Sequence, residues 1–183
     1  MAMFHFEPVK QEHRTLLKAW LSAPHAPEWW GDPDKEIQLI YDGEKTGESR
    51  GFIASADGEL FAYIQCWACE AQPAEAIVDE PWVAEQAPGT MGIDITIGPP
   101  NMLGKGLGSK AVRALADQLF ADGVPRVIID PDASNLRAVR AYEKAGFSRF
   151  DSYTNRDGSV TLLMERFPSS DTTPTPATGS RTT

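Results

Sequence analysis

A glycine-rich segment, residues 101–109 (Asn-Met-Leu-Gly-Lys-Gly-Leu-Gly-Ser), has the residue types needed to bind a diphosphate. It follows the β-like run 91–97 and opens a helix-like run over 110–120. Glycines let backbone amides approach phosphate oxygens, and the free N–H groups and dipole of a helix N-terminus favour negative charge. The segment predicts a pyrophosphate site; the structural alternative is a glycine turn that only caps a helix.

The glycine spacing excludes two common nucleotide sites. A P-loop places its lysine directly before a Mg²⁺-binding hydroxyl, whereas Lys105 lies between two glycines. A dinucleotide fingerprint needs Gly-x-Gly-x-x-Gly, and neither possible frame supplies the third glycine. The remaining spacing, x-x-Gly-x-Gly-x-Gly, resembles the acetyl-CoA loop of the GNAT acetyltransferases.

Length and composition predict one domain with one core. The chain has 183 residues, 42% of them hydrophobic, and its apolar runs are shorter than the ~18 residues that a membrane span needs. With no signal-like start and only two cysteines, Cys66 and Cys69, a cytoplasmic protein without a disulfide framework is expected. The net charge of −9 favours a cationic, polyamine-like substrate over nucleic acid or an anionic membrane.

The hydrophobic periodicity predicts a β-α-α-β-β start, then β-α-β-α and a final hairpin. Asp57-Gly58 and Asp157-Gly158 are the expected hairpin turns. The expected strands are 4–9, 50–55, 60–69, 91–97, 126–130, 148–153 and 159–166, and the expected helices are 12–23, 34–41, 110–120 and 135–145. The fold class is therefore α/β (α+β), a mixed central sheet of about seven strands flanked by about four helices. Residues 24–33 and 70–89 are expected to be loops, the second with at most a short helical turn.

Five motifs together resemble the aminoglycoside 6'-N-acetyltransferase branch of the GNAT proteins, over residues ~4–166. They are His25-Ala-Pro-Glu-Trp-Trp-Gly31, Gly92-Ile-Asp94, Leu103-Gly-Lys-Gly-Leu-Gly108, Ile129-Asp-Pro131 and Asn135-Leu-Arg-Ala-Val-Arg-Ala-Tyr-Glu-Lys-Ala-Gly-Phe147. The resemblance implies a GNAT domain over 1–167, and the Ser/Thr/Pro-rich composition of residues 168–183 predicts a disordered tail. It also implies acetyl-CoA as co-substrate, no metal, and direct acetyl transfer to a 6'-amine in a ternary complex.

Acetyl transfer from a thioester to an amine needs a proton acceptor for the substrate ammonium and a proton donor for the departing thiolate. The resemblance implies that Asp94 positions or deprotonates the amine and that Tyr142 protonates the CoA sulfur. Tyr142 lies seven residues, about two helical turns, after Asn135, so both side chains project from one side of that helix. Outside this context, Asp94 could cap a turn and Tyr142 could belong to the core.

The other site residues also follow from the resemblance. The implied CoA-binding residues are Ile95, Ile97, Met102, Gly104, Lys105, Gly106, Gly108, Ser109, Asn135 and Lys144. The implied acceptor-binding residues are Trp30, Asp79, Trp82, Asp130 and Asp157. Carboxylates pair with ammonium groups, and tryptophan rings stack on sugars and attract cations. Two of these residues have structural explanations as well, because Asp-Gly suits a turn at Asp157 and Trp30 could be a hydrophobic plug.

Several alternatives remain open. Siderophore-type lysine or hydroxylysine acyltransferases share the tryptophan-rich and glycine loops, but they usually carry histidine where this chain has Asp94. The segment after Asp79 lacks the paired tryptophan and dense acidic run of the resistance enzymes, so aminoglycoside activity could be incidental. A catalytically silent acetyl-CoA-binding module is the alternative from another class. The protein is expected to be a monomer or a homodimer.

Two further motifs are set aside. Residues 47–51 (Gly-Glu-Ser-Arg-Gly) have the spacing of a nucleophile elbow, but they precede a strand, and no histidine follows His25. Cys66 and Cys69 have the two-residue spacing of redox or zinc sites, but the sequence has no second ligand pair. Both cysteines are therefore expected to be structural.

Overall fold

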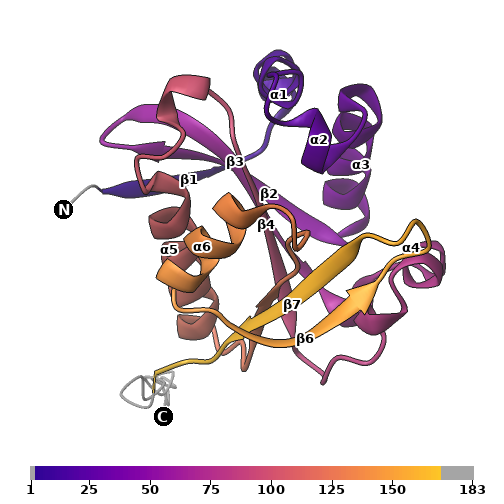
Figure 1. The fold of residues 1–183 in the computed structure, drawn as a ribbon. Helices are drawn as coiled ribbons and strands as arrows, with labels where there is room; N and C mark the ends of the chain where they lie inside the picture. The colour runs from indigo at the N-terminus through magenta and orange to yellow at the C-terminus, as the bar shows by residue number, and fades with distance from the viewer. Residues whose placement is uncertain (1–2, 170–183) are drawn as a thin grey trace, which may run out of the picture.

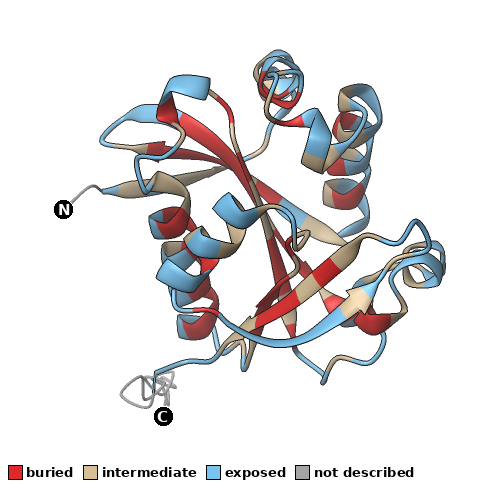
Figure 2. Cartoon of the chain, in the orientation of Figure 1, coloured by how far each residue is buried: buried red, intermediate tan, exposed pale blue. Residues whose placement is uncertain are grey.

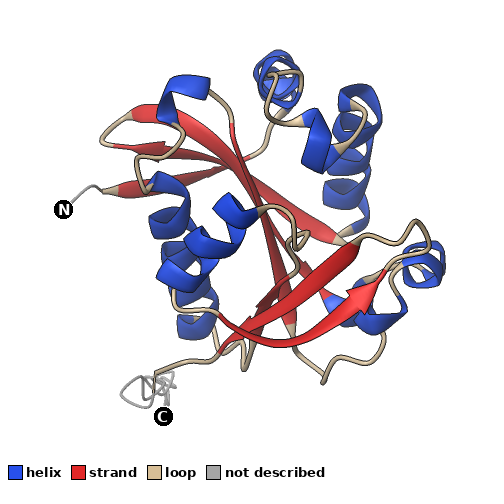
Figure 3. Ribbon diagram, in the orientation of Figure 1, coloured by secondary structure: helices blue, strands red, loops and turns tan. Residues whose placement is uncertain are grey.

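A computed structural model describes residues 3–169, and these form a twisted seven-stranded sheet with helices on both faces (Figures 1 and 3). The strands are β1 (Phe4–Pro8), β2 (Ser49–Ala56), β3 (Glu59–Ala68), β4 (Met91–Ile97), β5 (Val127–Ile129), β6 (Ser148–Thr154) and β7 (Val160–Arg166). Their order is β1-β2-β3-β4-β5-β7-β6. Every neighbouring pair is antiparallel except β4 and β5, so the predicted mixed sheet is confirmed. The predicted tail lies outside the described residues from 170 onward.

The described residues form six α-helices: α1 (Arg14–Leu21), α2 (Pro27–Trp30), α3 (Pro33–Thr46), α4 (Ala74–Asp79), α5 (Leu107–Ala121) and α6 (Leu136–Lys144). Helices α1 to α3 gather on one side of the sheet, and α5 and α6 lie on the other (Figure 1). None of the helices in residues 3–169 combines the length and apolarity needed to cross a membrane.

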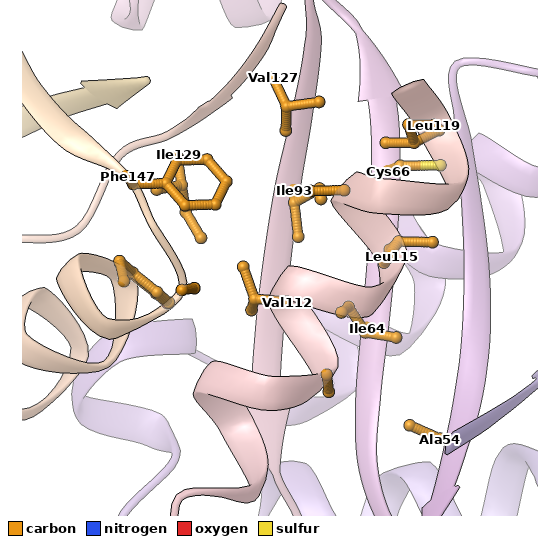
Figure 4. Close-up of a cluster of buried hydrophobic side chains, with 14 of the residues drawn as sticks. Ala54, Ile64, Cys66, Ile93, Val112, Leu115, Leu119, Val127, Ile129 and Phe147 are labelled. Carbon is orange, nitrogen blue, oxygen red and sulfur yellow. The ribbon is translucent and has the colours of Figure 1, made fainter. Parts of the chain in front are cut away.

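The main core lies between the sheet and α5. Val112, Leu115 and Leu119 of α5 point toward Ile93 of β4 and Ile64 of β3 (Figure 4), and all five are buried. Figure 2 shows the same pattern along the chain, with buried positions on the inner stripe of the helices and in the central strands. Burying a side chain of this size contributes about 1.5–3 kcal/mol, so this core fixes α5, and with it the glycine turn, against β4.

Helix α3 is longer than the sequence predicted. Asp32 Oδ1 accepts hydrogen bonds from the backbone N–H groups of Asp34 (3.1 Å) and Lys35 (3.0 Å), and Pro33 occupies the first turn. The helix ends at Gly47, which adopts the left-handed conformation (φ 81°). Hydrophobic periodicity did not predict residues 42–46 as helix, because this last part of α3 is mostly polar and partly exposed.

The two predicted loops contain more regular structure than expected. Residues 24–33 include α2, and residues 70–89 include α4 and a 3₁₀ turn at Pro81–Val83, preceded by another at Cys69–Ala71. Prolines start both short helices or precede them directly, at Pro27 and Pro73. Proline supplies the helical φ without needing an N–H partner, which is a local effect that hydrophobic periodicity does not detect.

Candidate functional site

Strands β4 and β5 separate at the centre of the sheet. They pair over only two residues of β4, Met91 and Gly92, although β4 continues to Ile97. Hydrogen-bonding direction alternates along a strand, and the Gly98 N–H donates to β3, so the backbone groups of Ile95 and Ile97 face the gap. No strand in residues 3–169 covers that edge beyond Gly92, so an extended amide-containing ligand can pair with it.

A cavity of about 880 Å³ follows this gap. Its lining combines the edge of β4, the turn before α5, one face of α6, and side chains from α3 and the 24–33 segment. His25 ties that segment to the gap, because its Nε2 lies 2.6 Å from the carbonyl oxygen of Ile97. Trp30 also lines the cavity while its ring packs edge-on against Tyr63 (centroids 5.8 Å apart), so it is both a wall and a core contact.

The glycine turn forms another part of the cavity wall. Gly104 and Gly106 both adopt φ 74°, a conformation that side chains with a Cβ avoid. Gly106 is the N-cap of α5, so the next N–H groups are free of helical partners and the helix dipole points its positive end at the turn. Gly108 and Ser109 also line the cavity, and the Ser109 hydroxyl donates to the Gly106 carbonyl (3.0 Å).

Helix α6 presents a row of cations to the cavity. Arg137, Arg140 and Lys144 follow one another at intervals of three and four residues, and all three line it. Of these three residues, only Lys144 was predicted from the resemblance to bind CoA. Asn135 lines the cavity too; its side-chain oxygen caps α6 by accepting from the Ala138 N–H (3.1 Å), and this bond leaves its NH₂ group for a ligand.

Asp94 lies near the middle of β4, half-buried, with one carboxylate oxygen held by two donors. Gln65 Nε2 donates to Asp94 Oδ2 at 2.8 Å, and Trp67 Nε1 donates to the same oxygen at 2.9 Å. Burial raises the pKa of Asp94, and these two hydrogen bonds lower it in part. The carboxylate faces the cavity and can accept a proton from a bound ammonium group.

Tyr142 of α6 is buried in the cavity wall. Burial raises the pKa of its phenol, and the negative charges of Asp94 and Asp130 raise it further. The phenol therefore stays protonated at neutral pH and can donate a proton. As the helical spacing predicted, Tyr142 and Asn135 line the same cavity.

A family model for the GNAT acetyltransferase domain matches residues 10–154. The chain belongs to the GNAT acetyltransferase family.

Curated relatives of this GNAT chain include the aminoglycoside N(6')-acetyltransferase type 1 of Klebsiella pneumoniae. It is 37% identical over 158 residues, which cover 82% of this chain and 76% of that protein. A kanamycin resistance protein of Rhizobium radiobacter is 47% identical over 85 residues, covering 46% and 79%. The solved structure of the aminoglycoside acetyltransferase AAC(6')-Ib with coenzyme A and kanamycin superposes with a TM-score of 0.78 at 33% identity, covering 90% of this chain and 95% of that one.

The cavity also contains two acidic residues, Glu36 and Glu80, that were not predicted from the sequence. Glu36 of α3 and Glu80, which follows α4, line it together with Asp94 and Asp130. Burial and the negative charge of Asp94 raise the pKa of Glu36 to about 7. Burial also raises the pKa of Asp130 and Glu80, and the neighbouring carboxylates add to both shifts. The four carboxylates therefore share one cavity, and no described cation lies within 4.0 Å of them.

Four predicted ligand-binding side chains lie outside the cavity lining. Asp79 is exposed and pairs with Arg156 (3.3 Å), and Asp157 accepts from the N–H and hydroxyl of Ser159 in its own turn. Trp82 is buried against Trp67, with ring centroids 6.5 Å apart. The fourth, Lys105, points its ammonium toward the sulfur of Met102 at 3.9 Å. The resemblance implied these residues by position but could not give the directions of their side chains, and Asp79 and Trp82 lie in α4 and a 3₁₀ turn instead of the expected loop.

The missed residues had weak signals in the sequence. Gln65 and Trp67 alternate on the predicted strand that precedes Asp94, and antiparallel pairing sets Gln65 opposite Asp94. Glu36 lies four residues before Ile40, so the two side chains share one face of α3, and both line the cavity. A carboxylate at a core-facing helical position was therefore the available clue.

Replacing Glu36 by glutamine should change how stability depends on pH. A carboxyl whose pKa is raised by folding favours the native state below its unfolded pKa, and that contribution is lost as pH rises from about 4.5 to about 7. After a discount for the partial exposure of Glu36, the variant should gain about 1 kcal/mol over wild type between pH 5.5 and pH 8 in urea unfolding. Glu59→Gln, at an exposed position on β3, is the control, and an equal gain there would contradict this role.

Proposed function

We propose that this protein is an acetyl-CoA-dependent N-acetyltransferase that acts on a primary amine of a polycationic small molecule, specifically the 6'-amine of an aminoglycoside. The observation that carries the proposal is the single cavity of about 880 Å³, whose lining includes both a diphosphate-binding turn and a group of carboxylates with no described cationic partner. The curated and solved relatives named for aminoglycoside acetylation support the same acceptor class.

The residues present fit coenzyme A. The backbone groups of Ile95 and the N–H of Ile97 suit the amides of pantetheine, since only the Ile97 carbonyl is taken up by His25. The N–H groups at the start of α5 suit the diphosphate. Arg137, Arg140 and Lys144 add positive charge for the phosphates. Met102 is buried beside the turn and adds apolar surface.

When bound, acetyl-CoA supplies a thioester carbonyl as the electrophile. Asp94 accepts a proton from the acceptor ammonium, and this exposes the nitrogen lone pair for attack on that carbonyl. Tyr142 then donates its phenolic proton to the sulfur as the C–S bond breaks, so the leaving group departs as a thiol. The second proton that the nitrogen loses on forming the amide restores the phenol, and Asp94 releases its proton to solvent. No residue has to act as a covalent nucleophile, which supports direct transfer in a ternary complex.

A polycation matches the electrostatics of the cavity. Asp130, Glu36 and Glu80 surround the reactive carboxylate without cationic partners, and like charges this close raise one another's pKa. Ammonium groups of the acceptor would relieve that repulsion on binding. Asp94 also favours this acceptor over the lysine or hydroxylysine of siderophore-type enzymes, which usually carry histidine at the matching position.

We place this activity in the cytoplasm, since Cys66 and Cys69 are both free and buried. We further propose that the protein is a monomer or a homodimer. An acceptor screen tests the function. Purified protein with acetyl-CoA is given aminoglycosides, lysine derivatives, polyamines and peptides, and free thiol release is recorded. Release with 6'-amino aminoglycosides, and none with matched 6'-hydroxyl compounds, is the expected result. Binding of acetyl-CoA without release for any amine would identify a silent module instead.

Asp130→Asn and Asp79→Asn form a matched pair that tests the acidic wall. Asp130 lines the cavity, whereas Asp79 is exposed and pairs with Arg156. Loss of one ammonium-carboxylate contact should weaken kanamycin binding by about 10-fold in Asp130→Asn and leave Asp79→Asn within 2-fold of wild type. Titration calorimetry measures both, and equal affinities for the two variants would remove Asp130 from the acceptor site.

A further inference from the structure

The side chains of Tyr63, Gln65 and Trp67 lie on one face of β3. Successive side chains in a strand alternate between faces, so these three share the face that pairs with Thr96, Asp94 and Gly92 of β4. Gln65 is directly opposite Asp94 in the antiparallel ladder. The strand register itself therefore brings Gln65 and Trp67 to the carboxylate and places Tyr63 beside Gln65.

These side chains form a directed hydrogen-bond chain. Tyr63 Oη donates to Gln65 Oε1 at 2.7 Å, so the amide is oriented with its NH₂ group toward Asp94. Gln65 and Trp67 both donate to Oδ2 of Asp94, at 2.8 Å and 2.9 Å. Within residues 3–169, Oδ1 of Asp94 accepts no hydrogen bond, so one oxygen is anchored and the other is available to the acceptor.

Two glycines make room for this arrangement. A Cβ at Gly92 would overlap the indole ring of Trp67, and a Cβ at Gly51 would lie 2.7 Å from the Tyr63 hydroxyl oxygen. Tyr63 is fully buried. Its ring is therefore closely packed, and the hydroxyl lies where it orients the Gln65 amide.

We propose that Tyr63, Gln65 and Trp67 are positioning residues that fix Asp94 with Oδ2 bound and Oδ1 directed at the acceptor amine. The proposal rests on the proposed acetyl transfer and adds to it the groups that orient the base. Tyr63 acts through Gln65 and does not itself reach the reacting atoms. Loss of either donor lets the carboxylate rotate and removes a hydrogen bond that favours its charged form.

The charged surroundings of Asp94 determine how the network should affect pH dependence. The groups around Asp94 include Glu36 on α3, Glu80 after α4, Asp130 after β5, Tyr142 on α6, and Tyr63 on its neighbour β3. Cys66 of β3 points to the opposite face of the sheet. The acidic groups among them oppose a charge on Asp94. The two donors are therefore the main groups that favour its ionised form, and removing one should raise its pKa.

Tyr63→Phe and Trp67→Phe test the proposal, and each keeps an aromatic ring. Trp67→Phe removes a donor to Asp94, whereas Tyr63→Phe removes the hydrogen bond that orients the Gln65 amide toward Asp94. With a 6'-amino aminoglycoside, kcat should fall about 5- to 20-fold in each variant, with the Kd for acetyl-CoA within 2-fold of wild type. The acid limb of kcat/KM should move to higher pH by about 0.5–1 unit. Tyr41→Phe is the control, since its hydroxyl donates to the Lys10 carbonyl (2.9 Å) outside the cavity.

Glu36 lines the same cavity, and its pKa is raised to about 7, so its titration could itself contribute to the acid limb. The Tyr63→Phe and Trp67→Phe measurements are therefore repeated in a Glu36→Gln background, where the shift of the acid limb should persist. Circular dichroism and melting curves check that each variant folds. Because the two variants remove different hydrogen bonds, either one that folds is enough to test the network. An unchanged kcat and pH profile in a folded Tyr63→Phe or Trp67→Phe, with an active wild type, would overturn the positioning role alone. An inactive wild type would overturn the proposed function instead.

Discussion

Asp94→Asn should lower kcat for acetylation of kanamycin or tobramycin by about 10²- to 10³-fold. The amide is isosteric with the carboxylate, and its oxygen can still accept from Gln65 and Trp67, so the cavity keeps its shape. The amide cannot take a proton from the ammonium group, so the amine stays protonated and unreactive.

Thiol release measures kcat, and titration calorimetry measures affinity for acetyl-CoA, which should stay within about 2-fold of wild type. The rate should also lose its dependence on the acid limb, since the group that titrates is gone. Equal turnover by the variant and wild type would exclude Asp94 as the base. A large loss of acetyl-CoA affinity would instead indicate a structural role.

Tyr142→Phe should lower kcat by about 10²-fold, because the departing thiolate then lacks its proton donor. The ring stays in the buried wall of the cavity, so affinity for acetyl-CoA should change little. In wild type, the raised pKa of this phenol keeps it protonated, so no basic limb from Tyr142 is expected between pH 6 and 9.

Tyr153→Phe is the matched control for Tyr142→Phe, since Tyr153 is a partly buried phenol outside the cavity lining. It should retain wild-type turnover. A Tyr142→Phe enzyme as fast as this control would mean that solvent, and not the phenol, protonates the sulfur.

The fold was predictable because its signals are local. Alternation, Asp-Gly turns and helical periodicity gave all seven strands and the four longer helices. The short helices α2 and α4 were missed because proline and tertiary packing stabilise them, without a repeating apolar pattern. The extension of α3 depended on the cap at Asp32 and the left-handed Gly47.

The candidate site was only partly predictable. Asp94, Asn135 and Tyr142 lie on regular elements whose register fixes their direction, and all three line the cavity. Asp79 and Asp157 lie at element ends, where a small backbone rotation decides between solvent and cavity. In the structure, Asp79 forms an ion pair with Arg156, and Asp157 accepts a hydrogen bond from the Ser159 hydroxyl.

The glycine turn, the order of elements and the carboxylate on the central strand could be predicted from the amino-acid sequence. These features depend on residue type and spacing within one segment. The tertiary structure was needed to show that β4 separates from β5 after Gly92, and that Gln65 and Trp67 both donate to one oxygen of Asp94. It also brought Glu36 and Arg140 to the same cavity as Asp94. The physical reason is that pairing and burial act between segments far apart in the chain, and no single segment records its partner.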